Sequence, residues 1–171
     1  MLLLQLGGKE SATLDKLPNR NQAYLIQPIE GGKGLLMVGR EPHGLYYAAK
    51  TIQQLIKAGL QNGQVQLPLV TITDWPDMQD RGFWGADSFN RLRWMSDRKM
   101  NIDEQISHTI INEQKQCSVE LHGDKQKIID EGPIYGINPL PVVLHLEQLT
   151  GMGIFKAYPE LRGKDGRPGS I

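Results

Sequence analysis

Hydrophobic and polar residues along the first half of the chain alternate in the manner of a small sheet with one helix. Four short runs rich in apolar residues have strand length, and a Gly-Gly turn suited to a hairpin separates the second run from the third. Between His43 and Ala58 apolar residues recur at helical spacing, with Pro42 just before them and Gly59 just behind. The expected strands are residues 1–6, 22–27, 34–39 and 65–73. This order predicts a sheet packed on one face by a helix.

The second half of the chain changes to a rhythm in which strands and helices alternate. Pro76 ends the preceding strand, and Arg81-Gly-Phe-Trp opens a new one. The expected strands are residues 81–85, 99–102 and 136–146, and the expected helices are residues 88–98 and 124–130. Alternation of this kind is typical of βα units in a parallel sheet. The sequence therefore predicts an α/β protein with two domains, residues 1–76 and 77–171.

The composition argues against binding to nucleic acid or to a membrane. A chain of 171 residues with 39% hydrophobic residues can bury one good core or two small ones. Lysine plus arginine and aspartate plus glutamate both count 19, so no basic field attracts nucleic acid or an anionic membrane. No apolar run approaches the roughly 20 residues of a membrane span, and residues 1–6 lack the flanks of an export signal. The single cysteine, Cys117, excludes an internal disulfide and leaves the compartment open.

Several short motifs are spread along the chain. They are Gly44-Leu-Tyr-Tyr with Thr51-Ile-Gln-Gln-Leu, Asp74-Trp-Pro with Arg81-Gly82, Lys99-Met-Asn, Tyr135-Gly-Ile, and Ala157-Tyr-Pro-Glu-Leu. Their order and spacing resemble glycoside hydrolase family 20, the β-N-acetylhexosaminidases. In that family the first motif opens the helix of a small α/β domain, and the Arg-Gly pair begins strand one of a (β/α)8 barrel. The other motifs lie around barrel strands two and three.

The resemblance implies an α+β accessory domain at residues 1–76 and the start of a TIM barrel at residues 77–171. A full barrel takes roughly 250 residues, so the second domain supplies about three of its eight βα units. In the family the catalytic Asp-Glu pair ends barrel strand four, which this stretch does not reach. Neither Asp103-Glu104 nor Asp130-Glu131 has the matching context. We therefore expect this hexosaminidase-like fragment to be inactive by itself.

The resemblance also implies the chemistry of the parent enzyme. Such an enzyme removes terminal N-acetylhexosamine from oligosaccharides by a substrate-assisted, retaining mechanism, and it needs no metal or organic cofactor. The histidines of this chain also lack the spacing of zinc ligands. Strand two departs from the family pattern, since Asp103-Glu-Gln-Ile-Ser-His stands where the family has His-Trp-His-Leu-Thr-Asp-Asp. A neighbouring hydrolase family of the same build therefore stays open.

Four residues are candidates for contact with a glycan. Arg81 matches the family arginine that holds the non-reducing sugar, and a guanidinium can donate a planar pair of hydrogen bonds to neighbouring hydroxyls. His145 and Glu147 alternate with leucines, which places both on one face at the end of an apolar strand. Trp84 can stack on a sugar ring. The alternatives are an ion pair of Arg81 with a nearby aspartate, a structural pair of His145 with Glu147, and a packing role for Trp84.

Two further hypotheses come from the same sequence. The chain can be a self-standing carbohydrate-binding or assembly protein whose exposed sheet edges pair with another copy, which gives a homo-oligomer. It can also be an ordinary two-layer α/β domain whose motifs match by chance. The order of the motifs favours the first hypothesis, a fragment of a glycosidase whose partner is an oligosaccharide.

Overall fold

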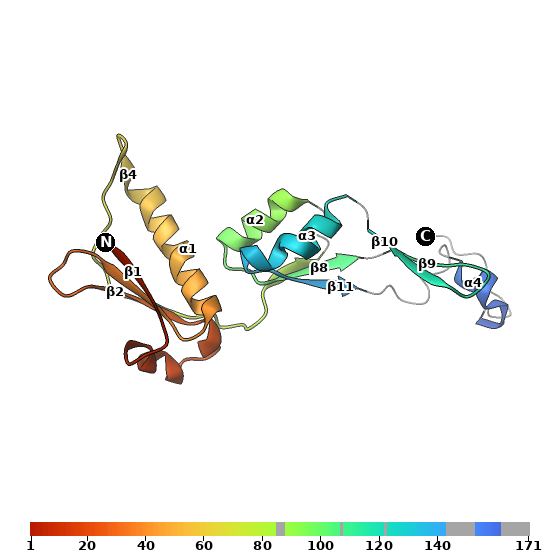
Figure 1. The fold of residues 1–171 in the computed structure, drawn as a ribbon, viewed down its shortest axis with the longest axis horizontal. Coiled ribbons are helices and arrows are strands. Elements are labelled where there is room, and N and C mark those ends of the chain that lie inside the picture. Colours follow the sequence, from red (N-terminus) through yellow and green to blue (C-terminus); the bar gives the residue numbers. More distant parts are fainter. Residues whose placement is uncertain (85–87, 107, 122, 143–152, 162–171) are drawn as a thin grey trace. The chain divides into compact units, whose positions relative to one another are not determined.

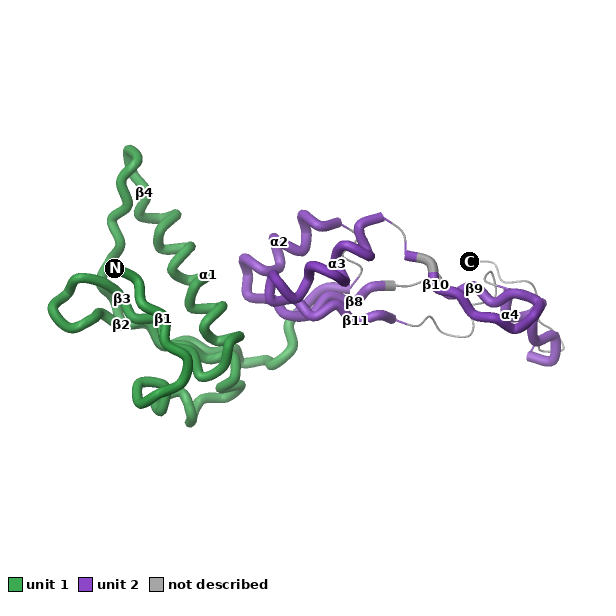
Figure 2. Tube along the Cα trace, viewed as in Figure 1, with its two compact units in different colours: residues 1–81 green, residues 82–171 purple. Residues whose placement is uncertain are grey.

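The structure, a computed structural model, describes residues 1–84, 88–106, 108–121, 123–142 and 153–161 (Figure 1). Its contacts divide the chain into two compact units, Met1–Arg81 and Gly82–Ile171 (Figure 2). The sequence predicted the division after residue 76. The predicted α/β class is confirmed, and each unit has a sheet and helices of its own. None of the described helices is long and apolar enough to cross a membrane.

Unit 1 is built on a mixed sheet of four strands. β2 (Tyr24–Pro28) and β3 (Leu35–Gly39) form the predicted hairpin, and β1 (Leu2–Leu6) runs parallel to β3 at one edge. β6 (Ile72–Asp74) pairs antiparallel with β2, which gives the order β1-β3-β2-β6. Successive side chains of a strand point to opposite faces, so the apolar residues of β2 and β3 feed a core on each face of the sheet.

The predicted helix, α1 (Pro42–Gly59), covers one face of this sheet (Figure 1). Gly44 allows the helix to approach the sheet closely, since a Cβ at that position would collide with the carbonyl oxygen of Ala23. The side chains buried on this face are Tyr24, Ile26, Leu35, Met37, Tyr47, Ala48 and Ile52.

The opposite face of the sheet packs against η1 (Glu10–Lys16), a 3-10 helix that the sequence pattern did not predict. Leu14 is fully buried there with Leu25 and Val38. The seven residues of η1 contain a single large apolar residue, so they show no helical periodicity of apolar positions. The hydrophobic pattern therefore could not predict this element.

The predicted strand at residues 65–73 is mostly wrong. Only Ile72–Asp74 joins the sheet, whereas β4 (Leu60–Gln61) and β5 (Gln64–Val65) pair with each other as a separate ribbon. The turn between them, Asn62-Gly63, has positive φ angles of 49° and 77°, which reverse the chain directly after α1. A proline follows within the run, and its missing N–H weakens any further pairing.

Unit 2 contains a parallel sheet of three strands. β7 (Gly82–Trp84), β8 (Ile102–Ile106) and β11 (Asn138–Val142) lie in the order β11-β8-β7. Between them in sequence come α2 (Phe89–Asp97) and α3 (Lys125–Glu131). This is the alternation of strand and helix that the sequence predicted. The strands described in this unit do not close into a barrel.

One apolar cluster holds the two helices of unit 2 together. Ser88 caps α2, because its hydroxyl accepts a hydrogen bond from the backbone N–H of Arg91 at 3.3 Å. The apolar face of α2 packs against α3 and the residue before β11. The buried members are Phe89, Leu92, Met95, Ile128 and Ile137.

Two details of unit 2 differ from the prediction. The second strand begins at Ile102 and not at Lys99, because Lys99 has a φ of 57° and turns the chain after α2. β9 (His108–Ile111) and β10 (Cys117–Glu120) form an antiparallel hairpin that the sequence pattern did not indicate. The part of the predicted strand 136–146 beyond residue 142 lies outside the described residues. The remaining helical turns are η3 (Gly132–Tyr135), α4 (Ile154–Ala157) and η5 (Pro159–Leu161).

We expect Leu92→Ala to lower the free energy of unfolding by about 2–5 kcal/mol, since Leu92 is fully buried and its removal leaves a cavity. Asn90→Ala is the matched control, because Asn90 lies exposed on the same helix. Urea denaturation followed by circular dichroism measures both variants. Equal unfolding midpoints for the two would contradict the core described for unit 2.

Candidate functional site

The guanidinium of Arg81 lies in a cluster of polar groups of unit 1. Its Nη2 donates to Gln22 Oε1 at 3.0 Å and to the hydroxyl of Tyr47 at 3.1 Å. Its Nη1 donates to the carbonyl oxygens of Met78 at 2.6 Å and Gln79 at 3.2 Å. The guanidinium carbon also lies 5.6 Å from the centre of the Tyr47 ring. Arg81 is therefore held in one orientation by its own unit.

Gln22 and Tyr47 are themselves fixed by the fold. Gln22 ends η2 (Arg20–Gln22), is 4% exposed, and donates through Nε2 to the carbonyl oxygen of Gln79 at 2.8 Å. Tyr47 lies on the buried face of α1 and is 2% exposed. Burial raises the pKa of the Tyr47 hydroxyl, while the positive charge of Arg81 opposes that rise. The hydroxyl therefore stays protonated at neutral pH and accepts the hydrogen bond from Arg81.

A second hydrogen-bonded group ties together three elements of the same unit. The Tyr24 hydroxyl donates to Asp74 Oδ2 at 2.6 Å and lies 2.6 Å from Thr51 Oγ1. Because the hydroxyl hydrogen of Tyr24 is used by the carboxylate, Thr51 is the donor in the second contact. Burial and the neighbouring Asp74 carboxylate raise the pKa of Tyr24. This group joins β2, α1 and β6, so it fixes the helix that carries Tyr47.

Trp84 projects from the face of the unit 2 sheet that α2 does not cover. Its neighbour Phe83 packs edge-on against Trp94 of α2, with 5.6 Å between the ring centres. Side chains alternate along a strand, so Trp84 points to the opposite face, where it is 66% exposed. Glu104 lies beside it in register on β8, and Leu140 lies beside Glu104 on β11. The indole ring is thus accessible to a ligand.

The adjacent carboxylates of β8 do not converge. Asp103 is fully buried, and Gln105 Nε2 donates to its Oδ2 at 2.5 Å. Glu104 is exposed on the opposite face of the strand. The Asp103 carboxylate, buried and hydrogen-bonded to Gln105, is therefore not accessible to a substrate.

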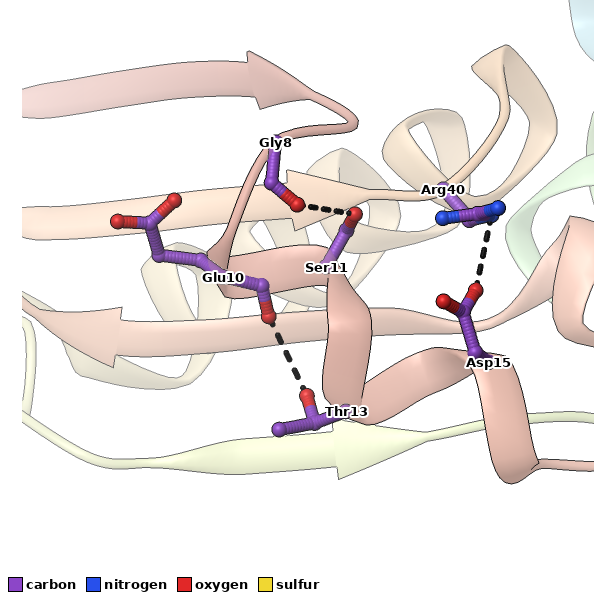
Figure 3. Close-up of polar contacts among 6 residues, drawn as sticks. All are labelled: Gly8, Glu10, Ser11, Thr13, Asp15 and Arg40. Atoms are coloured by element: carbon purple, nitrogen blue, oxygen red, sulfur yellow. Dashed lines mark hydrogen bonds and ion pairs between the residues drawn. The ribbon is translucent and has the colours of Figure 1, made fainter.

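The other polar contacts of unit 1 that Figure 3 draws have a structural role. Ser11 Oγ donates to the carbonyl oxygen of Gly8 at 2.8 Å, and Arg40 Nε lies 2.9 Å from Asp15 Oδ1. The first contact fixes the start of η1, and the second ties η1 to the residue that follows β3. Across the part of the chain that the structure describes, no three His, Cys, Asp or Glu side chains form a group that could hold a metal ion.

His145 and Glu147 lie outside the described residues, so their contact with a sugar stays a prediction. Gln22 and Tyr47, by contrast, were not among the sequence candidates. They precede Arg81 by 59 and 34 positions, and no local pattern links residues so far apart. The one signal available was the place of Tyr47 in the Gly44-Leu-Tyr-Tyr motif.

Solved structures of other proteins share the fold of this chain, whereas no family model matches its sequence. A solved β-N-acetylhexosaminidase matches 99% of the chain with a TM-score of 0.62 at 16% identity, and the chain covers 41% of it. The N-acetyl-β-hexosaminidase of Streptomyces plicatus, in complex with Thio-NAglucal, matches 99% of the chain with a TM-score of 0.62 at 16% identity, with 38% of it covered. A family 20 exo-β-N-acetylglucosaminidase from Vibrio harveyi, in complex with N-acetylglucosamine, matches 96% of the chain with a TM-score of 0.58 at 14% identity, with 30% of it covered.

The chain has the fold of part of a family 20 hexosaminidase. The resemblance that the motifs predicted is confirmed at the level of the fold. The chain spans less than half the length of these three hexosaminidases, between 30% and 41%. At 14–16% identity the likeness shows the fold alone. Activity and substrate therefore have to be argued from the residues.

Tyr47→Phe should lower the free energy of unfolding by about 1 kcal/mol at neutral pH, because Arg81 loses an acceptor. In the wild type, the stability contributed by the raised pKa of Tyr47 is fully present below its ordinary value of about 10 and is lost as the pH rises through the folded value. The variant should therefore lose less stability above pH 10 than the wild type does. Urea denaturation at about pH 8 and about pH 11 measures this difference.

Tyr46→Phe, at the neighbouring position of α1, is the matched control for that measurement. It removes a hydroxyl from the same helix and should leave the hydrogen bond between Arg81 and Tyr47 in place, so a larger loss of stability in Tyr47→Phe measures the lost acceptor. Equal stability of Tyr47→Phe and the wild type at both pH values would contradict the described hydrogen bond.

Proposed function

We propose that the chain is the accessory domain and the first part of the catalytic barrel of a glycoside hydrolase of the family 20 type. In this proposal unit 1 is the small α/β domain, and β7, β8 and β11 are barrel strands one to three. The observation that carries it is the order of the parallel strands β7, β8 and β11, with α2 and α3 between them and the β9–β10 hairpin inserted after β8. This order follows a helix-covered sheet, in a chain that matches a hexosaminidase over 99% of its length. The predicted boundary after residue 76 belongs to the same proposal.

The parent enzyme of this proposal removes terminal N-acetylhexosamine from a glycan by the substrate-assisted, retaining route. One of the matched structures is an exo-β-N-acetylglucosaminidase with N-acetylglucosamine bound, which supports this class of substrate. The general acid of such an enzyme would come from a later barrel strand. General acid catalysis contributes about 10²–10⁴-fold to a rate, so we propose that the chain by itself is inactive.

Arg81 carries the sugar-binding part of the proposal. Nη2 of its guanidinium donates hydrogen bonds to Gln22 and Tyr47, and both of these residues are buried. The hydrogen bonds of the other nitrogen go to backbone carbonyls of a solvent-exposed segment, so vicinal hydroxyls of a sugar can take their place. The other candidates for contact with glycan remain Trp84, with its exposed ring, His145 and Glu147.

Binding of N-acetylglucosamine to the 171-residue chain, followed by saturation-transfer NMR, tests this role. Weak binding is expected for the wild type, and Arg81→Ala should raise the dissociation constant at least about tenfold, because hydrogen bonds from a charged donor are lost. Arg40→Ala is the matched control, since Arg40 belongs to the same unit and pairs with Asp15. A folded Arg81→Ala variant with unchanged binding would remove Arg81 from the proposal.

Hydrolysis of 4-nitrophenyl N-acetyl-β-D-glucosaminide tests the enzyme part separately. We expect no release of nitrophenol from the chain alone, and release from a native gene product with an intact mass above 19.2 kDa. A native gene product of 19.2 kDa without hydrolysis would overturn the enzyme part and leave glycan binding to stand on the NMR result.

A further inference from the structure

The segment of unit 1 that follows β6 is held by its backbone carbonyls. Each of the four carbonyl oxygens of residues 76–79 accepts a hydrogen bond from a side chain of the same unit. Asn19 Nδ2 donates to the first two, at 2.9 and 3.3 Å. Arg81 Nη1 donates to the third at 2.6 Å, and Gln22 Nε2 donates to the fourth at 2.8 Å. A stretch outside the helices and strands is thus attached at every one of these residues.

Burial contributes little to the position of this segment. Pro76 is half-buried, and the side chains of residues 77–80 are all exposed. Met78, the large apolar residue among them, has 65% of its surface accessible. A stretch with few buried apolar contacts opens easily. The hydrogen bonds to its carbonyls therefore decide how often the segment leaves the rest of unit 1.

Asn19 has a backbone conformation that directs its amide to this segment. It lies directly before η2 with φ 48° and ψ 39°, the left-handed region that asparagine enters more readily than most residues. Its carbonyl oxygen accepts from the N–H of Gln22 at 2.8 Å, whereas its side chain does not cap η2. The amide donates to the segment instead. Glycine would keep this backbone and lose the amide donor, so experiment can separate the two properties.

The orientation of Arg81 depends on the same segment. Its Nη1 donates to the carbonyl oxygens of Met78 and Gln79, at 2.6 and 3.2 Å. When the segment moves away from unit 1, Nη1 loses both of these acceptors. The bonds of Nη2 to Gln22 and Tyr47 then have to hold a side chain whose own backbone has moved.

We propose that Asn19 is a positioning residue for Arg81. Asn19 holds the start of the segment and Gln22 holds its end, so the guanidinium keeps one orientation towards a ligand. Asn19 acts through the segment and not by contact with that ligand. That the ligand is a sugar rests on the proposed function, whereas the attachment of the segment does not.

Limited proteolysis with trypsin tests the attachment. Trypsin takes an arginine side chain into its specificity pocket, so cleavage between Arg81 and Gly82 requires the guanidinium to leave its acceptors. Cleavage of a transiently opened segment follows the population of the open form. Asn19→Gly keeps the left-handed backbone and removes the amide donor. Cleavage at this bond, identified by the masses of the fragments, should therefore become at least about fivefold faster.

Asn62→Gly is the matched control. Asn62 also has a left-handed φ, of 49°, and lies exposed in the turn between β4 and β5. This variant makes the same chemical change away from the segment and should leave cleavage after Arg81 unchanged. Hydrogen exchange of the amides of residues 77–81 should become faster in Asn19→Gly and not in Asn62→Gly. If Asn19→Gly does not fold by circular dichroism, Asn19→Asp replaces it, because an ionised carboxylate cannot donate.

Saturation-transfer NMR with N-acetylglucosamine adds a readout that a general loss of stability does not move. The folded Asn19→Gly variant should bind the sugar at least about threefold more weakly than the wild type and Asn62→Gly. Unchanged cleavage and exchange in Asn19→Gly overturn the proposal, and so does faster cleavage with unchanged sugar binding. A wild type that does not bind the sugar counts against the sugar-binding role of Arg81 under the proposed function, and cleavage and exchange then decide the positioning role of Asn19.

Discussion

Burial of one face of α1 against β2 and β3 is the interaction on which unit 1 and its candidate site depend. Side chains such as Ile26 and Ile52 are nearly or fully inaccessible there, and each contributes about 1.5–3 kcal/mol to folding. The close approach at Gly44 fixes how the helix lies on the sheet. Tyr47 belongs to the same buried face, so the packing that stabilises the unit also sets the position of the hydroxyl that holds Arg81. A helix turned by one residue, about 100°, would carry that hydroxyl away from the guanidinium.

The described part of unit 2 presents a parallel sheet with helices on one face and exposed side chains on the other. Phe83 packs towards α2, and Asp103 lies beside it in register, so the buried Asp103–Gln105 contact is on the covered face. A buried carboxylate needs such a hydrogen-bonding partner, since its desolvation is costly. Trp84 and Glu104 occupy the opposite, exposed face. β8 is the strand at which the sequence departs from the family pattern. One of its carboxylates, that of Asp103, is buried, and the other, that of Glu104, is exposed to solvent.

Local signals made most of the elements predictable. The helical spacing and flanking Pro42 and Gly59 located α1, and the helix predicted at residues 88–98 corresponds to α2. Predictions failed where a positive φ decided the outcome, as at Asn62-Gly63 and Lys99, because a left-handed residue reverses the chain without altering its hydrophobic pattern. In the candidate site, motif order pointed to Arg81, whereas nothing local pointed to Gln22.

The sequence by itself determined α1, α2 and α3, the β2–β3 hairpin and the alternation of strands and helices in unit 2, because spacing and turns act over a few neighbouring residues. The tertiary structure alone decided that Gln22 and Tyr47 orient Arg81, since hydrogen bonds across 59 and 34 positions depend on packing. It also decided that Asn19 holds the segment before Arg81 through backbone carbonyls. Both outcomes follow from how η2 and α1 pack together, and such packing is settled by burial between segments distant in the sequence.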